Sequence, residues 1–226
     1  PGEMDEWTHF LHGSANNAVA QDEMVGPPRH MQWRAPPLWC RSHETDSSIS
    51  SVVTADGRLF YILDEGPIGL KGPQFPPQWS LVARDAFNGA LLWKKPMSEW
   101  GWRQWQSSWE NKDWTETRGG RLISPKTVQR RLVADGTRVY VTLGYREPVT
   151  VLDARTGEVL RELDKTGATE EILCLDNTLV LRTVPSSGNG EFRGVMAVRP
   201  EDGRVSWKKG ADRVEPLTLA ASDGKV

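Results

Sequence analysis

The chain has 226 residues, of which 38% are hydrophobic and 26% are charged, a composition typical of folded globular proteins. Its 28 basic and 30 acidic residues are spread along the chain and leave a formal net charge of -2, so nothing indicates a nucleic-acid or anionic-membrane partner. No run reaches the roughly 20 apolar residues of a transmembrane helix, and no signal peptide is visible at the start.

Residues 1–28 are expected to form a lead-in arm, which contains "DEWTHFLHGSANNAVA" (5–20). Its His9 and His12 are three residues apart, so on a helix both could lie on one face as metal ligands. No third ligand is near them in the sequence, and hydrogen-bonded structural histidines are the main expectation. The next residues, "RHMQWRAPP" (29–37), are expected to form a lone strand.

Two short phrases alternate along the rest of the chain. Phrase one occurs as "DAFNGALLW" (85–93), "DARTGEVLR" (153–161) and "RPEDGRVSW" (199–207). Phrase two occurs as "ADGRLFYIL" (55–63), "ADGTRVYVTL" (134–143), "LDNTLVLRT" (175–183) and "SDGKV" (222–226). Because Asn-Gly and Asp-Gly tolerate the positive φ of a two-residue turn, each phrase predicts a β-hairpin.

The two hairpins together give four strands per repeat. The aspartates of phrase two at 135, 176 and 223 are 41 and 47 residues apart, within the ~40–50 residues of a propeller blade. The step from Asp56 to Asp135 is 79 residues, which indicates an insertion at about 97–128. The sequence therefore predicts an all-β fold, a partial β-propeller of four-stranded antiparallel blades.

Three complete blades are expected, at about 47–96, 129–164 and 169–210, with a fourth beginning near 214. Successive sheets must stack to cover their faces, so residues 29–226 are expected to form a propeller. With three complete blades and part of a fourth, this propeller would be incomplete. The chain begins with Pro1 and stops inside a hairpin. We therefore expect a fragment of a larger ring of 7–8 blades. The remaining blades would come from further chain, and the strand at 29–37 could complete one of them.

Phrase one supplies turn residues and a tryptophan four residues past the glycine. That indole would lie across the neighbouring blade while its N–H finds a carbonyl. The residues with these structural roles are Asp85, Asn88, Gly89, Trp93, Asp153, Thr156, Gly157, Asp202, Gly203 and Trp207. Blade two has Arg161 at the tryptophan position, so we expect weaker docking there, or docking by another side chain.

The three phrase-one turns resemble the PQQ-like (pyrroloquinoline quinone-like) repeat, with its Asp-x-x-Thr-Gly-x-x-x-Trp signature, and residues 5–20 look like the Trp-x-x-Phe lead-in of such proteins. "VGPPRHMQW" and "WSLVARDAFNGALLWKKP" are similar to large PQQ-like propeller proteins of planctomycete-type bacteria. The resemblance covers about residues 5–226. It implies a bacterial periplasmic, envelope or secreted protein, and the same repeat serves quinoprotein dehydrogenases and the assembly factor BamB.

The insertion is rich in tryptophan. It contains five of the chain's 11 tryptophans, namely Trp100, Trp102, Trp105, Trp109 and Trp114. If they are exposed, their flat rings would stack a sugar, a quinone or a peptide. If they are buried, they would anchor the insertion as a lid on the propeller.

Other candidate groups are scattered. "HETD" (43–46) has an acid–base composition, while "LDEGP" (63–67) and "GATEE" (167–171) contribute carboxylates that spacing alone does not pair. Cys40 and Cys174 have no Cys-x-x-Cys spacing, which favours two lone thiols over one long-range disulfide. No hydrolase, nucleoside-triphosphatase or dinucleotide-binding motif is present in the sequence.

These features favour a binding or scaffolding module with no catalysis visible in the segment. The alternative is part of a quinoprotein-type oxidoreductase, or a propeller fused to a catalytic domain. No cofactor is predicted: PQQ with calcium enters only through the resemblance, and the vicinal cysteines of a quinoprotein dehydrogenase are missing. The partner, whether a protein, a small molecule or a carbohydrate, is left open.

Overall fold

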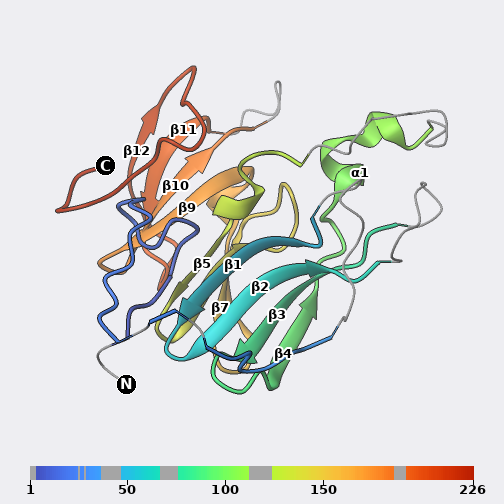
Figure 1. Cartoon of the computed structure of the whole chain (residues 1–226). Coiled ribbons are helices and arrows are strands. Elements are labelled where there is room, and N and C mark those ends of the chain that lie inside the picture. The colour runs from blue at the N-terminus through green and yellow to red at the C-terminus, as the bar shows by residue number, and fades with distance from the viewer. Residues whose placement is uncertain are drawn as a thin grey trace.

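The computed structural model describes residues 4–24, 26–27, 29–36, 47–66, 76–111, 124–185 and 192–226. Within these ranges the strands form three four-stranded antiparallel sheets. In each sheet the strands follow one another in chain order, so that every sheet is an up-and-down meander (Figure 1). The prediction of an all-β partial propeller with three complete blades is confirmed.

Each blade is made of consecutive strands. Blade one contains β1 (Ile49–Ala55), β2 (Arg58–Asp64), β3 (Trp79–Asp85) and β4 (Leu91–Pro96). Blade two contains β5 (Leu132–Asp135), β6 (Arg138–Thr142), β7 (Val149–Asp153) and β8 (Val159–Leu163). Blade three contains β9 (Thr169–Leu175), β10 (Thr178–Thr183), β11 (Gly194–Val198) and β12 (Val205–Gly210).

Helical structure in the described residues is limited to single turns. These are α1 (Trp102–Trp105) and the 3-10 turns η1 (Ser107–Trp109), η2 (Val128–Arg130) and η3 (Asp164–Thr166). Within these residues no helix has the length and apolar character needed to cross a membrane.

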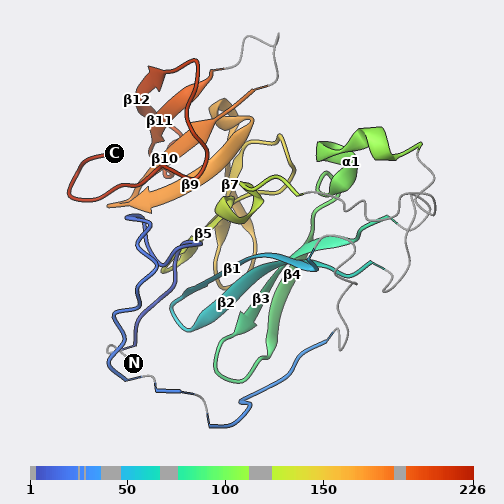
Figure 2. The same cartoon turned by 45° about the horizontal axis from the view of Figure 1, so that its top comes forward.

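The blades stack face to face (Figure 2). Apolar side chains fill the space between them. Between blades one and two lie, among others, Phe60, Ile62, Leu81, Leu132 and Val141. Between blades two and three lie, among others, Tyr140, Val151, Leu179, Leu181 and Met196. The first strands of the blades are neighbours, because β1 contacts β5 and β5 contacts β9. These three inner strands therefore line the axis side of the assembly.

The phrase-two turns adopt the predicted two-residue geometry. Asp56 and Gly57 have φ of 49° and 69°, and Ala55 pairs with Arg58 across the turn. Near the C-terminus, Asp223 and Gly224 repeat this conformation with φ of 50° and 70°. Just before that turn, Leu219 and Ala221 pack against Leu173 and Val180 on the free face of blade three. Residues 219–226 thus begin as the inner strand of a next blade would.

The phrase-one turns are longer than predicted. The N–H of Gly89 bonds to the carbonyl of Asp85 at 3.0 Å, so four residues, not two, make the turn. The aspartate side chain supports this turn, because Asp85 Oδ1 accepts from the N–H groups of Phe87 and Asn88 at 2.9 Å each. This local capping stabilises a wider turn, which Gly89 closes with a φ of 74°.

Blade two repeats this turn and blade three modifies it. Asp153 Oδ1 accepts from the N–H groups of Arg155 and Thr156 at 2.9 and 2.8 Å, and Gly157 has a φ of 73°. In blade three Arg199 stands where the first aspartate is expected. Asp202 instead caps the far side of the turn by accepting from Arg204 N at 3.0 Å.

Trp93 docks on the next blade as predicted. Its Nε1 donates to the carbonyl of Ala154 at 3.0 Å, and its ring lies directly over Gly157, where an added Cβ would come within 2.6 Å of it. The fit thus depends on a glycine that also has the positive φ which side chains disfavour.

Trp33 makes the same contact with blade one. Its Nε1 donates to the carbonyl of Ala86 at 2.9 Å, and a Cβ on Gly89 would lie 2.6 Å from its ring. The predicted strand at 29–37 is wrong for the described residues 29–36, which are not assigned to a strand. They have no partner strand among the described residues, and side-chain contacts hold them on the turn of blade one.

The contact between blades two and three lacks a tryptophan, as expected from Arg161. The nearest side chain to the Cβ position of Gly203 is Leu163, whose Cδ2 is 3.6 Å away. Trp207 of blade three is 43% exposed. Its ring has no following phrase-one turn to cover within the described residues.

These contacts predict a difference between two glycines of nearly equal φ. Gly203→Ala should lower the free energy of unfolding by roughly 1–2 kcal/mol, because the backbone conformation is strained for alanine. Gly157→Ala should cost roughly 1–3 kcal/mol more, because the methyl group also overlaps the Trp93 ring. Urea denaturation of both variants measures the two effects. Equal losses would show that the tryptophan contact adds nothing to the backbone requirement.

Candidate ligand site

The lead-in arm closes one end of the inner strands. Four backbone N–H groups donate hydrogen bonds to the arm. They occupy equivalent positions, because each donor residue directly precedes the first residue of the pair that flanks a phrase-two turn. Their bonds run from Thr54 to the Trp7 carbonyl at 2.8 Å, from Ala134 to the Thr8 carbonyl at 3.0 Å, from Cys174 to His9 Nε2 at 2.9 Å and from Ala221 to the Ser14 carbonyl at 2.9 Å. In Figure 1 the arm, in dark blue, lies on the opposite side of the sheets from α1.

His9 is a buried structural histidine with a defined tautomer. Its Nε2 accepts from the Cys174 N–H, so Nδ1 carries the proton and donates to Thr8 Oγ1, 2.7 Å away. The side chain is 4% exposed. Burial, together with the positive charge of Arg130 nearby, lowers the pKa of His9 to about 4.

His12 does not join His9 in a metal site. The two residues form an isolated β-bridge instead of one helical turn, which corrects the helix arrangement considered from their spacing. His12 Nε2 is 2.9 Å from the carboxylate oxygens of Asp5. Both histidines therefore hold the arm together.

The tryptophan-rich insertion lies at the other end of the inner strands. Trp100 and Trp102 are 2% and 3% exposed, and Trp105 is half-buried. Trp114 and the side chain of Trp109 lie outside the described residues. The faces of Trp100 and Trp102 are covered by protein, so this pair acts as an anchor.

Trp105 links the insertion to two blades. Its ring centroid is 6.5 Å from that of Trp79 at the start of β3, and 5.6 Å from that of Tyr145 in the loop between β6 and β7. It also meets the Trp100 ring edge-on at 6.0 Å. Such edge-to-face contacts favour one relative orientation of the rings, which fixes the position of Tyr145.

Arg131, just before β5, lies beneath this aromatic cluster. It is 1% exposed, and its guanidinium carbon lies 4.5 Å from the Tyr145 ring centroid and 5.8 Å from that of Trp100. Its Nη1 donates to the Tyr145 carbonyl, whereas its Nε has no hydrogen-bond partner among the described residues. Burial lowers the pKa of Arg131 to about 10, so the side chain is charged at neutral pH.

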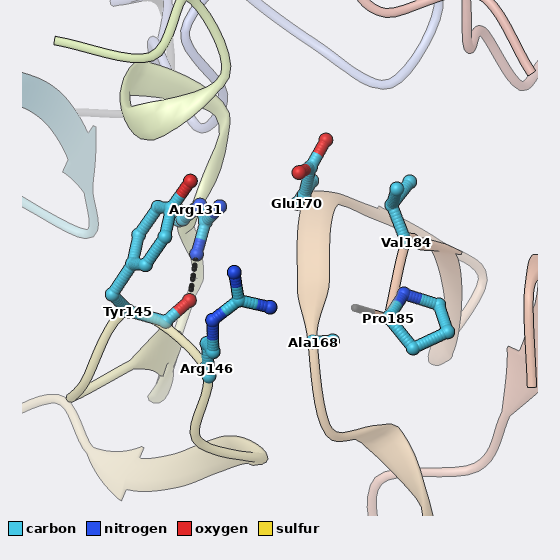
Figure 3. Close-up of a pocket in the computed structure, with 7 residues that line it drawn as sticks. All are labelled: Arg131, Tyr145, Arg146, Ala168, Glu170, Val184 and Pro185. Atoms are coloured by element: carbon cyan, nitrogen blue, oxygen red, sulfur yellow. Dashed lines mark hydrogen bonds between the residues drawn. The ribbon is translucent and has the colours of Figure 1, made fainter. Parts of the chain in front are cut away.

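A small opening lies next to Arg131, between blades two and three (Figure 3). Its volume is about 190 Å³. The residues that line it are Arg131, Tyr145, Arg146, Ala168, Glu170, Val184 and Pro185. One wall carries the two guanidinium groups and the facing wall carries small apolar side chains with one carboxylate. The opening therefore suits a compact ligand with a negative end and a short apolar part.

The two carboxylates of "GATEE" (167–171) have polar partners in the folded structure. Glu170 forms an ion pair with Arg182, which is buried. Glu171 accepts from the Leu217 N–H at 2.6 Å and lies 3.9 Å from Arg182. Burial raises the pKa of Glu171. Both carboxylates thus have structural partners.

The remaining candidate groups have structural surroundings or lie outside the described residues. Within "LDEGP" (63–67), Asp64 accepts from the N–H groups of Gly66 and Gln78 and so caps the loop after β2. Cys174 is a buried free thiol, and burial raises its pKa. Cys40 and "HETD" (43–46) lie outside the described residues.

Apart from "GATEE" (167–171), whose Glu170 was noted as an unpaired carboxylate, the residues around the opening were missed by sequence analysis. The signal available was the pair Arg130 and Arg131 directly before an apolar inner strand, a position where a charged side chain must find a partner or a cavity. Tyr145 and Arg146 come from a loop of the same blade, and Glu170 comes from the next blade. Only the packed fold brings these together.

The opening beside Arg131 does not fit pyrroloquinoline quinone. Its volume of about 190 Å³ is below the ~300–1,000 Å³ of pockets that enclose ligands of drug size. Within the described ranges, no group of three or more His, Cys, Asp and Glu side chains could hold a metal ion such as calcium.

Comparison with known proteins places the chain in a class and then in a family. The class is that of PQQ-like propellers, and the four-stranded blades and their tryptophan contacts agree with it. The family model described as "Outer membrane protein assembly factor BamB" matches residues 80–226, and the chain belongs to this family. A search of curated proteins gives no match.

Solved structures were also compared with the chain, all at low sequence identity. A europium-containing methanol dehydrogenase is 13% identical, with a TM-score of 0.50 over 91% of this chain and 32% of its own. The quinohemoprotein alcohol dehydrogenase from Comamonas testosteroni is 13% identical, with a TM-score of 0.49 over 91% of this chain and 27% of its own. BamB from Moraxella catarrhalis is 12% identical, with a TM-score of 0.34 over 73% of this chain and 47% of its own. The chain spans about a third of the methanol dehydrogenase, and the likeness to this protein, at 13% identity, shows the fold alone.

The arm contact of His9 predicts a pH dependence of stability. His9 has a pKa of 6.5 when unfolded and about 4 when folded, so between these values the unfolded chain binds more protons and stability falls as the pH falls. The full shift corresponds to roughly 3 kcal/mol. His9→Gln keeps an acceptor for the Cys174 N–H but does not titrate.

Denaturation midpoints measured from pH 7 to pH 4 test this effect. The difference in stability between the natural protein and His9→Gln should change across this range, whereas the exposed His30→Gln should follow the natural protein throughout. Parallel curves for the natural protein and His9→Gln would contradict the assigned contact.

Proposed function

We propose that the chain is a binding or scaffolding module of a bacterial envelope or secreted protein, and that its ligand enters at the insertion end of the propeller. The observation that carries this is the difference between the two ends. The arm occupies one end by accepting hydrogen bonds from four backbone N–H groups, three through its own carbonyls and one through the His9 side chain. The other end has an opening beside a buried arginine with few partners.

The tryptophan cluster supports this function by positioning the opening. Trp105 packs on Tyr145, and Tyr145 holds Arg131 through its ring and its carbonyl. In this proposal Trp100, Trp102 and Trp105 are positioning residues. Trp109 and Trp114 belong to the same insertion, for which a contact surface for a ligand or partner was one of two predictions from the sequence.

The family's description as an outer membrane protein assembly factor supports a place in the envelope. The rival function is part of a quinoprotein-type oxidoreductase, as the name of the methanol dehydrogenase suggests. The two functions differ in whether the chain binds a quinone tightly.

Calorimetric titration with pyrroloquinoline quinone, with and without calcium, separates the two functions. A binding module whose ligand site is the opening beside Arg131 should show no calcium-dependent heat at micromolar quinone, because that opening is too small to enclose the fused rings. Calcium-dependent binding at micromolar concentration or tighter would contradict the module and favour the oxidoreductase.

A further inference from the structure

The guanidinium of Arg131 has no carboxylate in direct contact within the described residues, although the charge of Glu170 acts on it from across the opening. Its one hydrogen bond within the described residues goes to a neutral carbonyl, that of Tyr145, although a guanidinium carries several N–H donors. No carboxylate of those residues lies within 4.0 Å of it. Burying a charged group without a partner of opposite charge is costly, so the site is poised to receive an anion.

A second guanidinium faces the same opening. Arg146 is exposed, and its guanidinium carbon lies 5.5 Å from the Tyr145 ring centroid. Figure 3 shows the side chains of Arg131 and Arg146 on the same side of the opening, with Glu170 across from them. The two arginines can therefore approach one ligand group from the interior and from the rim.

The one carboxylate in the lining does not neutralise these arginines directly. Glu170 is paired with Arg182, and Arg182 also donates to the Val214 carbonyl at 2.8 Å. Because Arg182 already compensates the charge of Glu170, the positive charge of the two guanidinium groups in the opening is in excess.

The shape of the opening limits the ligand. Its volume of about 190 Å³ admits a small group, and Ala168, Val184 and Pro185 form an apolar surface on the wall facing the arginines. Guanidinium groups bind carboxylates through paired, charge-assisted hydrogen bonds. An aliphatic segment beside the carboxylate would contact the apolar wall.

We propose that this opening binds a carboxylate carried on a short aliphatic chain, with the guanidinium groups of Arg131 and Arg146 holding the carboxylate and Val184 and Pro185 contacting the chain. The carboxylate comes from a free small acid or from a glutamate side chain of a bound peptide. The proposal rests on the proposed function, since it names the ligand chemistry of the same site.

The test is an NMR titration of the isotope-labelled protein with three probes. These are glutarate, N-acetylglutamate amide and its neutral counterpart N-acetylglutamine amide. At least one of the two carboxylates should shift the backbone amide signals of Ala168 and Val184 and the side-chain Nε–H signal of Arg131, and the glutamine probe should not. Binding of glutarate alone would identify a free acid as the source, and binding of the glutamate probe would identify a peptide side chain.

Arg146→Gln should weaken carboxylate binding about tenfold, because one charge-assisted contact is lost. Arg155→Gln, which removes an exposed arginine from the blade-two turn, is the matched control and should leave the affinity unchanged. Arg131→Gln should abolish binding, and if that variant does not fold, the comparison of the Arg146 and Arg155 variants decides.

Equal shifts with the glutamate and glutamine probes, no shifts with either carboxylate, or unchanged affinity in Arg146→Gln would overturn the proposal. These failures leave the binding module itself standing, because that function is tested by quinone titration. Calcium-dependent quinone binding would reject the module whatever the carboxylate result.

Discussion

A four-stranded sheet exposes two apolar faces and can bury neither without a neighbour, and this constraint determines the rest of the structure. Each blade covers one face of the next, with Phe60 and Leu81 against Leu132 on one side of blade two and Tyr140 against Leu179 on the other. The tryptophan contacts lock this stacking at the outer strand, because a ring fits over a glycine turn only in one relative position of the blades. Where the tryptophan is replaced by Arg161, Leu163 is the nearest side chain to the turn.

Stacking also makes the two ends of the inner strands different. At one end, the N–H groups that the strands cannot satisfy among themselves bond to a single arm, which links blade one, blade two, blade three and the C-terminal turn segment. At the other end, the insertion packs its tryptophans on Trp79 and Tyr145 and leaves Arg131 beside an opening. One end is thus closed by hydrogen bonds from backbone N–H groups of the blades to the arm, and the other end is shaped by aromatic side chains.

The fold was predictable because its signals are local. An Asp-Gly pair fixes a turn wherever it occurs, and the spacing of such pairs gives the strands and the blades. The width of the phrase-one turn was mispredicted: the four-residue turn forms with the aspartate cap in blade one and without it in blade three, where Arg199 takes the place of the aspartate. The strand expected at 29–37 failed because strand formation needs a partner. The candidate site was not predictable: Arg131, Arg146 and Glu170 belong to two blades, and composition alone does not tell whether Trp100 and Trp102 are buried or exposed.

The arm holds the inner strands at one end, and we propose that the other end receives a ligand. Amide hydrogen exchange at Thr54, Ala134, Cys174 and Ala221 tests the role of the arm, because each of these N–H groups has its acceptor in the arm. All four should exchange slowly, at rates similar to those of the central-strand amides of β2 and β6. Exchange at rates typical of exposed loops would contradict that role.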